Sequence, residues 1–406
     1  MRILHTSDWH LGARLCDRER IDEQKEFLMW LRETLDKESI DILLVSGDIF
    51  DSTNPPNSAE MLYYDFLCSI RESCCHATVI IGGNHDSITK LNSPKELLRH
   101  LSVYVNGGTG NTPEDDVITI RDSSGKPMAI VCAVPFLRER DVHIPKAGEF
   151  WQERETAVID GIMTYYRRTL HRALEVKDQS NIPILAMGHL FITGSLSGAG
   201  QRDLYVGNLG SIPADIFSDG FDYTALGHIH KPQKVASRQD LRYCGSPLHM
   251  DFGEKGDKQV LISEFNGSEL LNVISVQVPE FRKLIRFKGD FEEVINQLDE
   301  FDPPDGPFWA DAEISGGKAI GDINKLMNER ALGKGFEFLR IKVLTVEGEN
   351  ILSPERSIEI KDLTVEEVFI KRCEKSGLTE DDISDLLPLY NELMIKVEEG
   401  DNCDEN

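Results

Sequence analysis

The chain has 406 residues, 40% hydrophobic and 28% charged, a composition that is typical of a globular protein and excludes a fibrous or wholly disordered one. This length predicts two or three domains. The net charge of −26 argues against a protein that binds nucleic acid over its whole surface, although residues 346–406, with 18 acidic and 6 basic side chains, supply nearly half of the excess. The eight cysteines have no metal-site spacing, and the chain shows neither a membrane-length apolar run nor a signal peptide at its start. We therefore expect reduced thiols and a cytoplasmic protein.

The first 265 residues alternate short apolar runs with helical patterns. We predict strands at Arg2–Ser7, Asp41–Ser46, Ala77–Ile81, Met128–Val134, Ile182–Met187, Tyr223–Leu226 and Gln259–Phe265, and helices at Phe27–Leu35, Ala59–Ile70 and Thr156–Leu174. Buried strands separated by helices indicate an α/β layered fold.

A different pattern begins after Pro279. Strands at Phe281–Lys288, Phe308–Ile314 and Phe338–Leu344 alternate with helices at Phe291–Phe301 and Ile320–Met327, which predicts a small α+β domain. Farther on, Thr364 and Glu367 form a capping-box pattern that opens one helix, and a second helical pattern runs from Ile383 to Val397. We thus expect domains at 1–278 and 279–346, helices within 347–398, and a disordered acidic tail at 399–406.

Five predicted strands run directly into segments rich in Gly, Asp, Asn and His. These segments are Asp8-Trp9-His10, Gly47-Asp48-Ile49-Phe50-Asp51, Gly82-Gly83-Asn84-His85-Asp86, Gly188-His189 and Gly227-His228-Ile229-His230. In open α/β sheets, functional groups gather beyond the carboxyl ends of the strands, so we expect the five loops to converge at one sheet edge. Alternating residues of a strand end lie on the same side, so Asp8 and His10 can point the same way, as can His228 and His230.

The side chains of these segments form a mixed oxygen and nitrogen ligand set without thiolates. The candidate metal ligands are Asp8, His10, Asp48, Asn84, His189, His228 and His230. Carboxylate and carbonyl oxygens suit Mn and Mg, whereas imidazole suits Zn, Fe and Mn. Seven ligands exceed what one ion accepts beside water and substrate, so we expect two ions that share the Asp48 carboxylate. Each motif alone is more often a turn or a core histidine, but five in succession are poorly explained in that way.

Together these motifs resemble the signature of calcineurin-like metallophosphoesterases. The flanking segments Met1–Gly12, Gly82–Ser87 and Arg242–Pro247 are similar to the SbcD family, the nuclease subunits of bacterial SbcCD complexes. The resemblance covers essentially the whole chain and implies a layered metallophosphoesterase sandwich with a small α+β capping domain and C-terminal helices. Gly83 stands where protein phosphatases of the superfamily are expected to carry Arg beside the Asn-His motif.

The resemblance also implies a role for each site residue. Asp8, His10 and His230 would hold the first metal ion, Asn84, His189 and His228 the second, and Asp48 would bridge them; Mn²⁺ is the preferred ion, and Mg²⁺ is possible. The catalytic pair would be His85, facing the scissile phosphate as general acid, and Asp86, orienting His85. Asp51 would support the loop rather than bind metal, and His249 receives no role.

The family's activity is the hydrolysis of DNA phosphodiesters by a two-metal mechanism. The resemblance implies a double-strand exonuclease and a hairpin or single-strand endonuclease in DNA end processing, repair, recombination and replication. It also implies an SbcC-like ABC-type ATPase that binds residues 347–398, and a homodimer within a heterotetramer, away from membranes. The chain has no Gly-x-x-x-x-Gly-Lys-Ser/Thr loop, which fits an ATPase supplied by another chain.

Several features leave alternatives open. The basic clusters Arg282, Lys283, Arg286, Lys288 and Arg167, Arg168, His171, Arg172 could contact phosphates, but solvated faces explain them more simply. Tyr63, Tyr64, Phe66 and Leu67 are candidates for a dimer surface, with ordinary core as the alternative. The function alternatives are a small-molecule phosphodiesterase or phosphatase of the same superfamily, and a non-catalytic scaffold, although a scaffold would be expected to have lost ligands.

Overall fold

A computed structural model describes residues 1–145, 149–192, 195, 212–217, 220–315, 323–344, 372–373, 386–387 and 390. The chain divides into two compact units, Met1–Val346 and Glu347–Asn406. In the second unit the described residues Arg372, Cys373, Leu386, Leu387 and Tyr390 are helical. The capping box at Thr364 and Glu367, most of the predicted C-terminal helices and the tail 399–406 lie outside the described residues.

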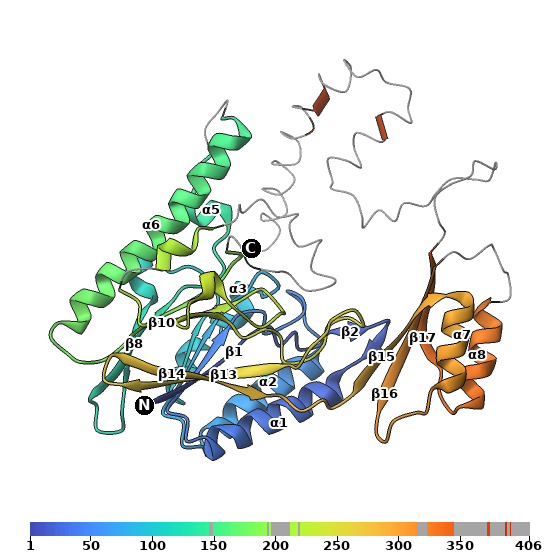
Figure 1. Ribbon diagram of the computed structural model, residues 1–406. Coiled ribbons are helices and arrows are strands. Elements are labelled where there is room, and N and C mark those ends of the chain that lie inside the picture. The colour runs from blue at the N-terminus through green and yellow to red at the C-terminus, as the bar shows by residue number, and fades with distance from the viewer. Residues whose placement is uncertain are drawn as a thin grey trace. The chain divides into compact units, whose positions relative to one another are not determined.

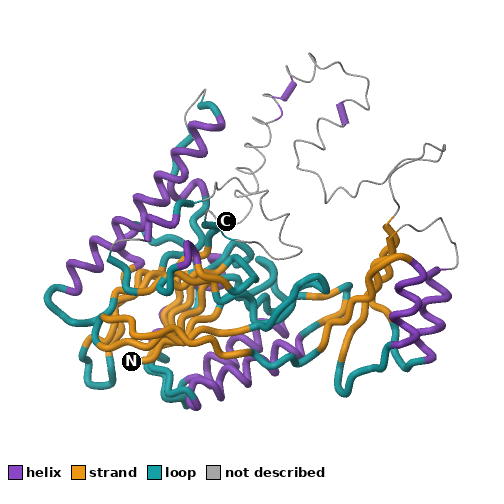
Figure 2. Tube along the Cα trace, viewed as in Figure 1, coloured by secondary structure: helices purple, strands orange, loops and turns teal. Residues whose placement is uncertain are grey.

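Two six-stranded sheets form the larger part of the first unit (Figures 1 and 2). In order across the first sheet, the strands are β14 (Glu269–Gln277), β13 (Gln259–Asn266), β1 (Arg2–Thr6), β4 (Ile42–Ser46), β5 (Ala77–Ile81) and β6 (Val103–Asn106). In the second they are β11 (Gln233–Lys234), β12 (Leu241–Tyr243), β10 (Tyr223–Gly227), β9 (Ile184–His189), β8 (Pro127–Ala133) and β7 (Val117–Arg121). The central strands of each sheet are parallel. Antiparallel strands occupy one side of the first sheet (β13 and β14) and both edges of the second (β11 and β7), whereas the other edge strand of the first sheet, β6, is parallel.

Helices cover the outer faces of both sheets, which makes four layers (Figure 1). The long helices α1 (Ile21–Lys37) and α2 (Asn57–Ile70) pack on the first sheet, and α6 (Trp151–Lys177) packs on the second. A third cluster of buried apolar side chains fills the space between the sheets. The short helices are α3 (Ile88–Asn92), α4 (Lys95–Arg99), α5 (Glu139–Val142), η1 (Pro113–Asp116), η3 (Ala214–Phe217) and η4 (Val235–Ser237), and β2 (Arg14–Leu15) and β3 (Arg18–Glu19) form a hairpin.

Residues 283–344 fold into a smaller parallel sheet with two helices on one face (Figure 1). Its elements are β15 (Lys283–Asp290), α7 (Phe291–Glu300), β16 (Phe308–Ser315), α8 (Ile323–Gly333) and β17 (Phe338–Leu344). A separate apolar cluster that includes Phe287, Leu298 and Met327 lies between this sheet and its helices. We call these residues the small α/β module.

The layered α/β fold predicted from the sequence is confirmed, and each predicted strand and helix before Pro279 overlaps an observed one. Strands β6, β7, β11, β12 and β14 and the two small hairpin strands were not predicted. Strand β12 has only three residues, and β14 is a largely exposed edge strand, so neither offers a continuous buried run. Of the four candidate dimer residues, Tyr63, Phe66 and Leu67 are 1%, 4% and 1% exposed within the core, so they are not available for a dimer surface. Tyr64 is partly buried and packs against the same core.

No helix in the described part of the chain is long and apolar enough to span a membrane.

A buried carboxyl lies where η1 packs against α6. Asp116 is 3% exposed and accepts a hydrogen bond of 2.6 Å from the Tyr165 hydroxyl. Burial raises the pKa of Asp116 to about 6, although hydrogen bonds from Tyr165 and Asn106 act in the opposite direction. The folded protein therefore binds a proton at Asp116 at a pH where the unfolded chain has released it.

Replacing Asp116 with Asn should change how stability depends on pH. Because the pKa is raised in the fold, ionisation of Asp116 destabilises the native state as pH rises from about 4 to about 6, by up to about 3 kcal/mol. Asp116→Asn keeps an acceptor for the Tyr165 hydroxyl and cannot ionise, so the variant does not lose this stability as pH rises. We expect the difference in unfolding free energy, variant minus wild type, to grow between pH 4 and pH 7 in urea titrations. Asp160→Asn, an exposed change on α6, is the control and should give a constant difference.

Candidate metal centre

The two sheets meet at the carboxyl ends of their central strands. The hydroxyl of Ser46, at the end of β4, donates to the carbonyl of Ala225 in β10 at 3.0 Å. Next to it, a Cβ built on Gly227 would lie only 1.9 Å from the Ser46 carbonyl oxygen. A side chain at residue 227 would therefore push the sheets apart at the point where the predicted site residues converge.

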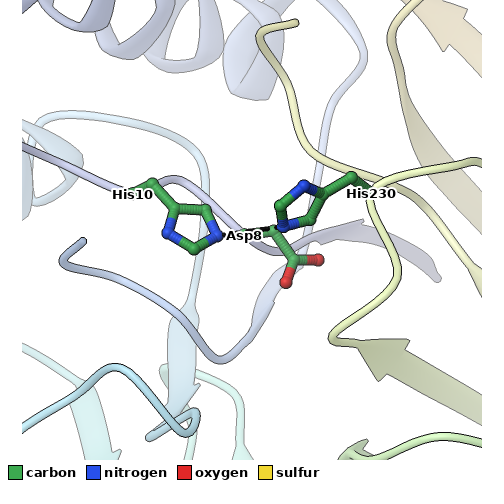
Figure 3. Close-up of side chains that lie close together, drawn as sticks. All are labelled: Asp8, His10 and His230. Carbon is green, nitrogen blue, oxygen red and sulfur yellow. Dashed lines mark hydrogen bonds between the residues drawn. The ribbon is translucent and has the colours of Figure 1, made fainter. Parts of the chain in front are cut away.

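Three residues from distant parts of the sequence form the first group of candidate ligands. Figure 3 shows Asp8, His10 and His230 with their polar atoms close together. The Nε2 atoms of His10 and His230 are 3.1 Å apart, and one ligand atom from each of the three residues lies within 4.8 Å of the others. Asp8 is fully buried and accepts a hydrogen bond of 2.9 Å from the amide of His228.

The second group gathers around the Asn84 side chain. Its Oδ1 lies 3.0 Å from His189 Nε2 and 3.1 Å from His228 Nδ1. The other nitrogen of His189, Nδ1, donates to the carbonyl of Ser46 at 2.9 Å, which directs Nε2 toward the site. Asn84 from the first sheet therefore joins two histidines from the second.

Asp48 lies between the two groups. Its Oδ2 is 3.2 Å from His189 Nε2 and 3.6 Å from His10 Nε2, and its Oδ1 accepts a hydrogen bond of 3.0 Å from the amide of His85. Since one carboxylate oxygen faces a histidine of each group, Asp48 has the position required of a bridging ligand.

The local backbone differs from the extended geometry assumed from the sequence. Asp8, His10, Asp48 and His228 have φ of 53°, 45°, 49° and 95°, in the left-handed region that favours glycine. Strand β1 ends at Thr6, so alternation along a strand does not explain how Asp8 and His10 reach one place. The prediction of one sheet edge was also wrong, because the loops come from the ends of two facing sheets. Strained non-glycine residues of this kind cluster at functional sites.

Buried charge at the site shifts several pKa values. Burial acts to raise the pKa of Asp48, but His189, His10 and His85 together hold that pKa well below its usual range. Burial acts to lower the pKa of His189, but Asp48 raises it to about 9. Burial and the neighbouring His189 lower the pKa of His228 to about 4. Asp48 and His189 thus stabilise each other's charged forms in the buried site.

The residues present fit divalent cations. The facing nitrogens of His10 and His230 can share one proton or donate both lone pairs to one cation, and the buried Asp8 and Asp48 carboxylates supply negative charge beside them. The donors are carboxylate and amide oxygens, which suit Mg and Mn, and imidazole nitrogens, which suit Zn and Fe. All seven predicted ligands lie in this one region of the structure.

His85 adjoins the ligands, but Asp86 does not orient it as expected. His85 Nδ1 lies 2.8 Å from the carbonyl oxygen of Asp51, and its ring centroid is 5.0 Å from that of His10. The fully buried Asp86 carboxylate instead accepts hydrogen bonds from the amides of Ile49, Phe50 and Gly83, at 3.1, 3.0 and 2.8 Å. Asp86 therefore fixes the loops that carry Asp48 and Asn84.

Three more residues near the ligands complete the description. Asp51 Oδ1 lies 3.2 Å from His10 Nδ1, and Glu254 Oε1 lies 3.7 Å from His230 Nδ1. Glu254 was missed, although Glu254 and Lys258 are a Glu–Lys pair four residues apart just after the Arg242–Pro247 motif. His249 Nε2 contacts the Gly256 carbonyl at 3.0 Å, beside a polar cavity of about 290 Å³ that Glu254 and Lys258 also line.

The basic clusters are largely engaged in ion pairs. Arg282 pairs with Glu23 at 3.0 Å, and Lys288 pairs with Glu313 at 2.6 Å. On α6, Arg168 pairs with Glu114 at 2.8 Å. Ion pairs within the chain therefore account for these residues without a phosphate. Arg168 and Lys288 lie on solvated faces, as the alternative interpretation expected, whereas Arg282 and Arg286 are partly buried.

Replacing Gly83 with Ala should disrupt the metal centre without unfolding the chain. A Cβ at Gly83 would lie 2.2 Å from Asp48 Oδ1 and 2.3 Å from the Asp48 amide nitrogen, so Asp48 must move. We expect Mn²⁺ affinity, measured by calorimetric titration, to fall ~10-fold or more. Gly333→Ala, where no atom lies within 4 Å of the added Cβ, is the control and should bind Mn²⁺ as wild type does. Unchanged affinity in Gly83→Ala would show that the loop tolerates a side chain.

Comparison with known proteins places these features in a family. A family model described as calcineurin-like phosphoesterase matches residues 1–232, and the model SbcD_C, described as the type 5 capsule protein repressor C-terminal domain, matches residues 280–376. The SbcD subunit of the nuclease SbcCD from Escherichia coli K12 is 34% identical over 94% of each chain, and its counterpart from Bacillus subtilis is 29% identical over 99% of this chain and 100% of its own. A dimetal phosphatase from Danio rerio, 12% identical, covers 68% of this chain and 99% of its own at a TM-score of 0.38, too low to bear on function. The chain belongs to the SbcD family of calcineurin-like phosphoesterases.

Proposed function

We propose that this chain is the nuclease subunit of an SbcCD-type complex and cleaves DNA phosphodiesters with two divalent metal ions. Mn²⁺ is the ion that we propose as preferred. The observation that carries this proposal is the convergence of Asp8, His10, Asp48, Asn84, His189, His228 and His230 where the two sheets meet, with His85 beside them. It is further supported by the relatives that are SbcD subunits of SbcCD nucleases.

Each ligand set would hold one ion. Asp8, His10 and His230 would bind the first, Asn84, His189 and His228 the second, and Asp48 would bridge them. Such ions, when bound, neutralise charge on the phosphate and make water a competent nucleophile at neutral pH. The chain contributes by fixing the donors: the Ser46 carbonyl holds the His189 ring, and Asp86 holds the loops that carry Asp48 and Asn84.

His85 is the candidate general acid. Its Nδ1 lies at hydrogen-bond distance from the Asp51 carbonyl, which can only accept, so Nδ1 carries a proton and Nε2 is the nitrogen left for the substrate. Its amide donates to Asp48 Oδ1, which ties the His85 backbone to the bridging carboxylate. A proton held at Nε2 can pass to the sugar oxygen that leaves as the P–O bond breaks.

The remaining parts of the chain would select substrate and partner. We propose that residues 1–278 form the nuclease domain and 279–346 a capping domain that guides DNA. The separate apolar cluster of 283–344 supports the division into two domains. Residues 347–398 would bind an SbcC-like ABC-type ATPase, followed by an acidic tail at 399–406. A homodimer within a heterotetramer, acting on DNA ends and hairpins in the cytoplasm, completes the proposal.

Replacing His85 with Ala should remove turnover and leave metal binding in place. Loss of a general acid typically costs ~10²–10⁴-fold in rate, and the His85 ring is not one of the seven proposed ligands. The measurement is single-turnover cleavage of a labelled DNA hairpin, with Mn²⁺ stoichiometry determined in parallel. His171→Ala, an exposed histidine on α6, is the control. Wild-type rates in a metal-loaded His85→Ala protein would contradict the assignment.

Metal removal tests the proposed function as a whole. We expect the purified chain to cleave a DNA hairpin and a blunt duplex with Mn²⁺, to stop with EDTA, and to recover when Mn²⁺ is added back. Turnover of a small phosphodiester alone would favour a small-molecule phosphodiesterase. Binding of two ions without cleavage of either substrate would favour a scaffold.

A further inference from the structure

The two ring nitrogens of His230 face different partners. Nε2 lies 3.1 Å from His10 Nε2, on the side of the ligand cluster, whereas Nδ1 lies 3.7 Å from Glu254 Oε1. The second distance is longer than a hydrogen bond and within the range of an ion pair, so Glu254 acts on the ring through its charge. A negative charge beside Nδ1 favours the tautomer with its proton on Nδ1, which leaves the lone pair on Nε2.

Lys258 holds both Glu254 and the backbone of His230. Its Nζ donates to Glu254 Oε2 at 2.6 Å, to Ser246 Oγ at 2.9 Å and to the carbonyl of His230 at 3.3 Å. The side chains of Lys258 and Glu254 are only 8% and 6% exposed. The lysine therefore fixes the carboxylate relative to the residue on which that carboxylate acts.

Stability alone is a weak reason for this arrangement. A buried ion pair contributes little net stability, because the cost of removing two charges from water offsets their attraction. A carboxylate on the far side of a histidine ligand, by contrast, sets the tautomer and orientation of the ring. The geometry of Lys258, Glu254 and His230 fits a role in orienting the His230 ring.

We infer that Glu254, held by Lys258, is a positioning residue that keeps His230 Nε2 available to the first metal ion. This inference rests on the proposed function, because it assumes a metal ion at Asp8, His10 and His230. It adds two residues from the segment that follows the Arg242–Pro247 motif to the machinery of the site.

The test is a Mn²⁺ titration of the full-length chain, in which the electron paramagnetic resonance signal measures the concentration of free Mn²⁺. Wild type should bind two ions. Glu254→Gln keeps the shape of the side chain and removes its charge, and we expect one of the two ions to bind ~10–100-fold more weakly. Asp257→Asn removes the same charge from an exposed position in the same loop and is the matched control, expected to bind both ions as wild type does.

A second variant guards against misfolding. Glu254→Gln leaves the buried Lys258 without its carboxylate partner. The double variant Glu254→Gln/Lys258→Met removes both charges and should show the same loss of Mn²⁺ affinity at one site. Thermal melting curves would confirm that each protein is folded. Wild-type affinities in the folded variants, or an equal loss in Asp257→Asn, would overturn the inference and leave the proposed function intact. A wild-type chain that binds no divalent ion would overturn both.

Discussion

The site depends on how closely the two sheets approach at the ends of their central strands. At Gly227 even one methyl group would lie 1.9 Å from the Ser46 carbonyl, and at Gly83 it would lie 2.2 Å from the Asp48 carboxylate. Because those positions carry no side chain, Asn84 from the first sheet can reach His189 and His228 from the second. The apolar layer between the sheets stabilises the sandwich, and the two glycines allow the loops of the two sheets to approach each other at the site.

Close approach brings a concentration of buried charge that the protein must compensate. Asp8, Asp48 and Asp86 are 0%, 2% and 0% exposed. Each of the three carboxylates accepts at least one hydrogen bond from a backbone amide. Amide donors stabilise a carboxylate without adding a side chain to the crowded centre. The Asp86 carboxylate accepts hydrogen bonds from three backbone amides, so it fixes two loops, although Asp86 is next to His85 in the sequence.

The sequence was sufficient for the elements whose patterns are local. Buried strands such as β4 and β5 are continuous apolar runs, and each ends in polar residues at the site, so the candidate ligands could be predicted from the sequence. Three features were not predicted: the convergence of the site loops from two different sheets, the left-handed backbone at Asp8 and His10, and the contact of Glu254 with His230. Each of these depends on tertiary contacts between residues far apart in the chain, and the pairing of Arg282 with Glu23, 259 residues away, escaped prediction for the same reason.

The segment 246–258 links the small α/β module to the metal centre. Its Asp251 pairs with Arg286 at 3.4 Å and Arg340 at 3.6 Å, both of which also bind Asp311 of the module. Three residues later, Glu254 lies beside His230. Partly exposed ion pairs typically contribute only ~0–1 kcal/mol each, less than the apolar core of the module itself supplies. The segment therefore contacts the module through partly exposed ion pairs at Asp251 and the metal centre through the buried side chain of Glu254.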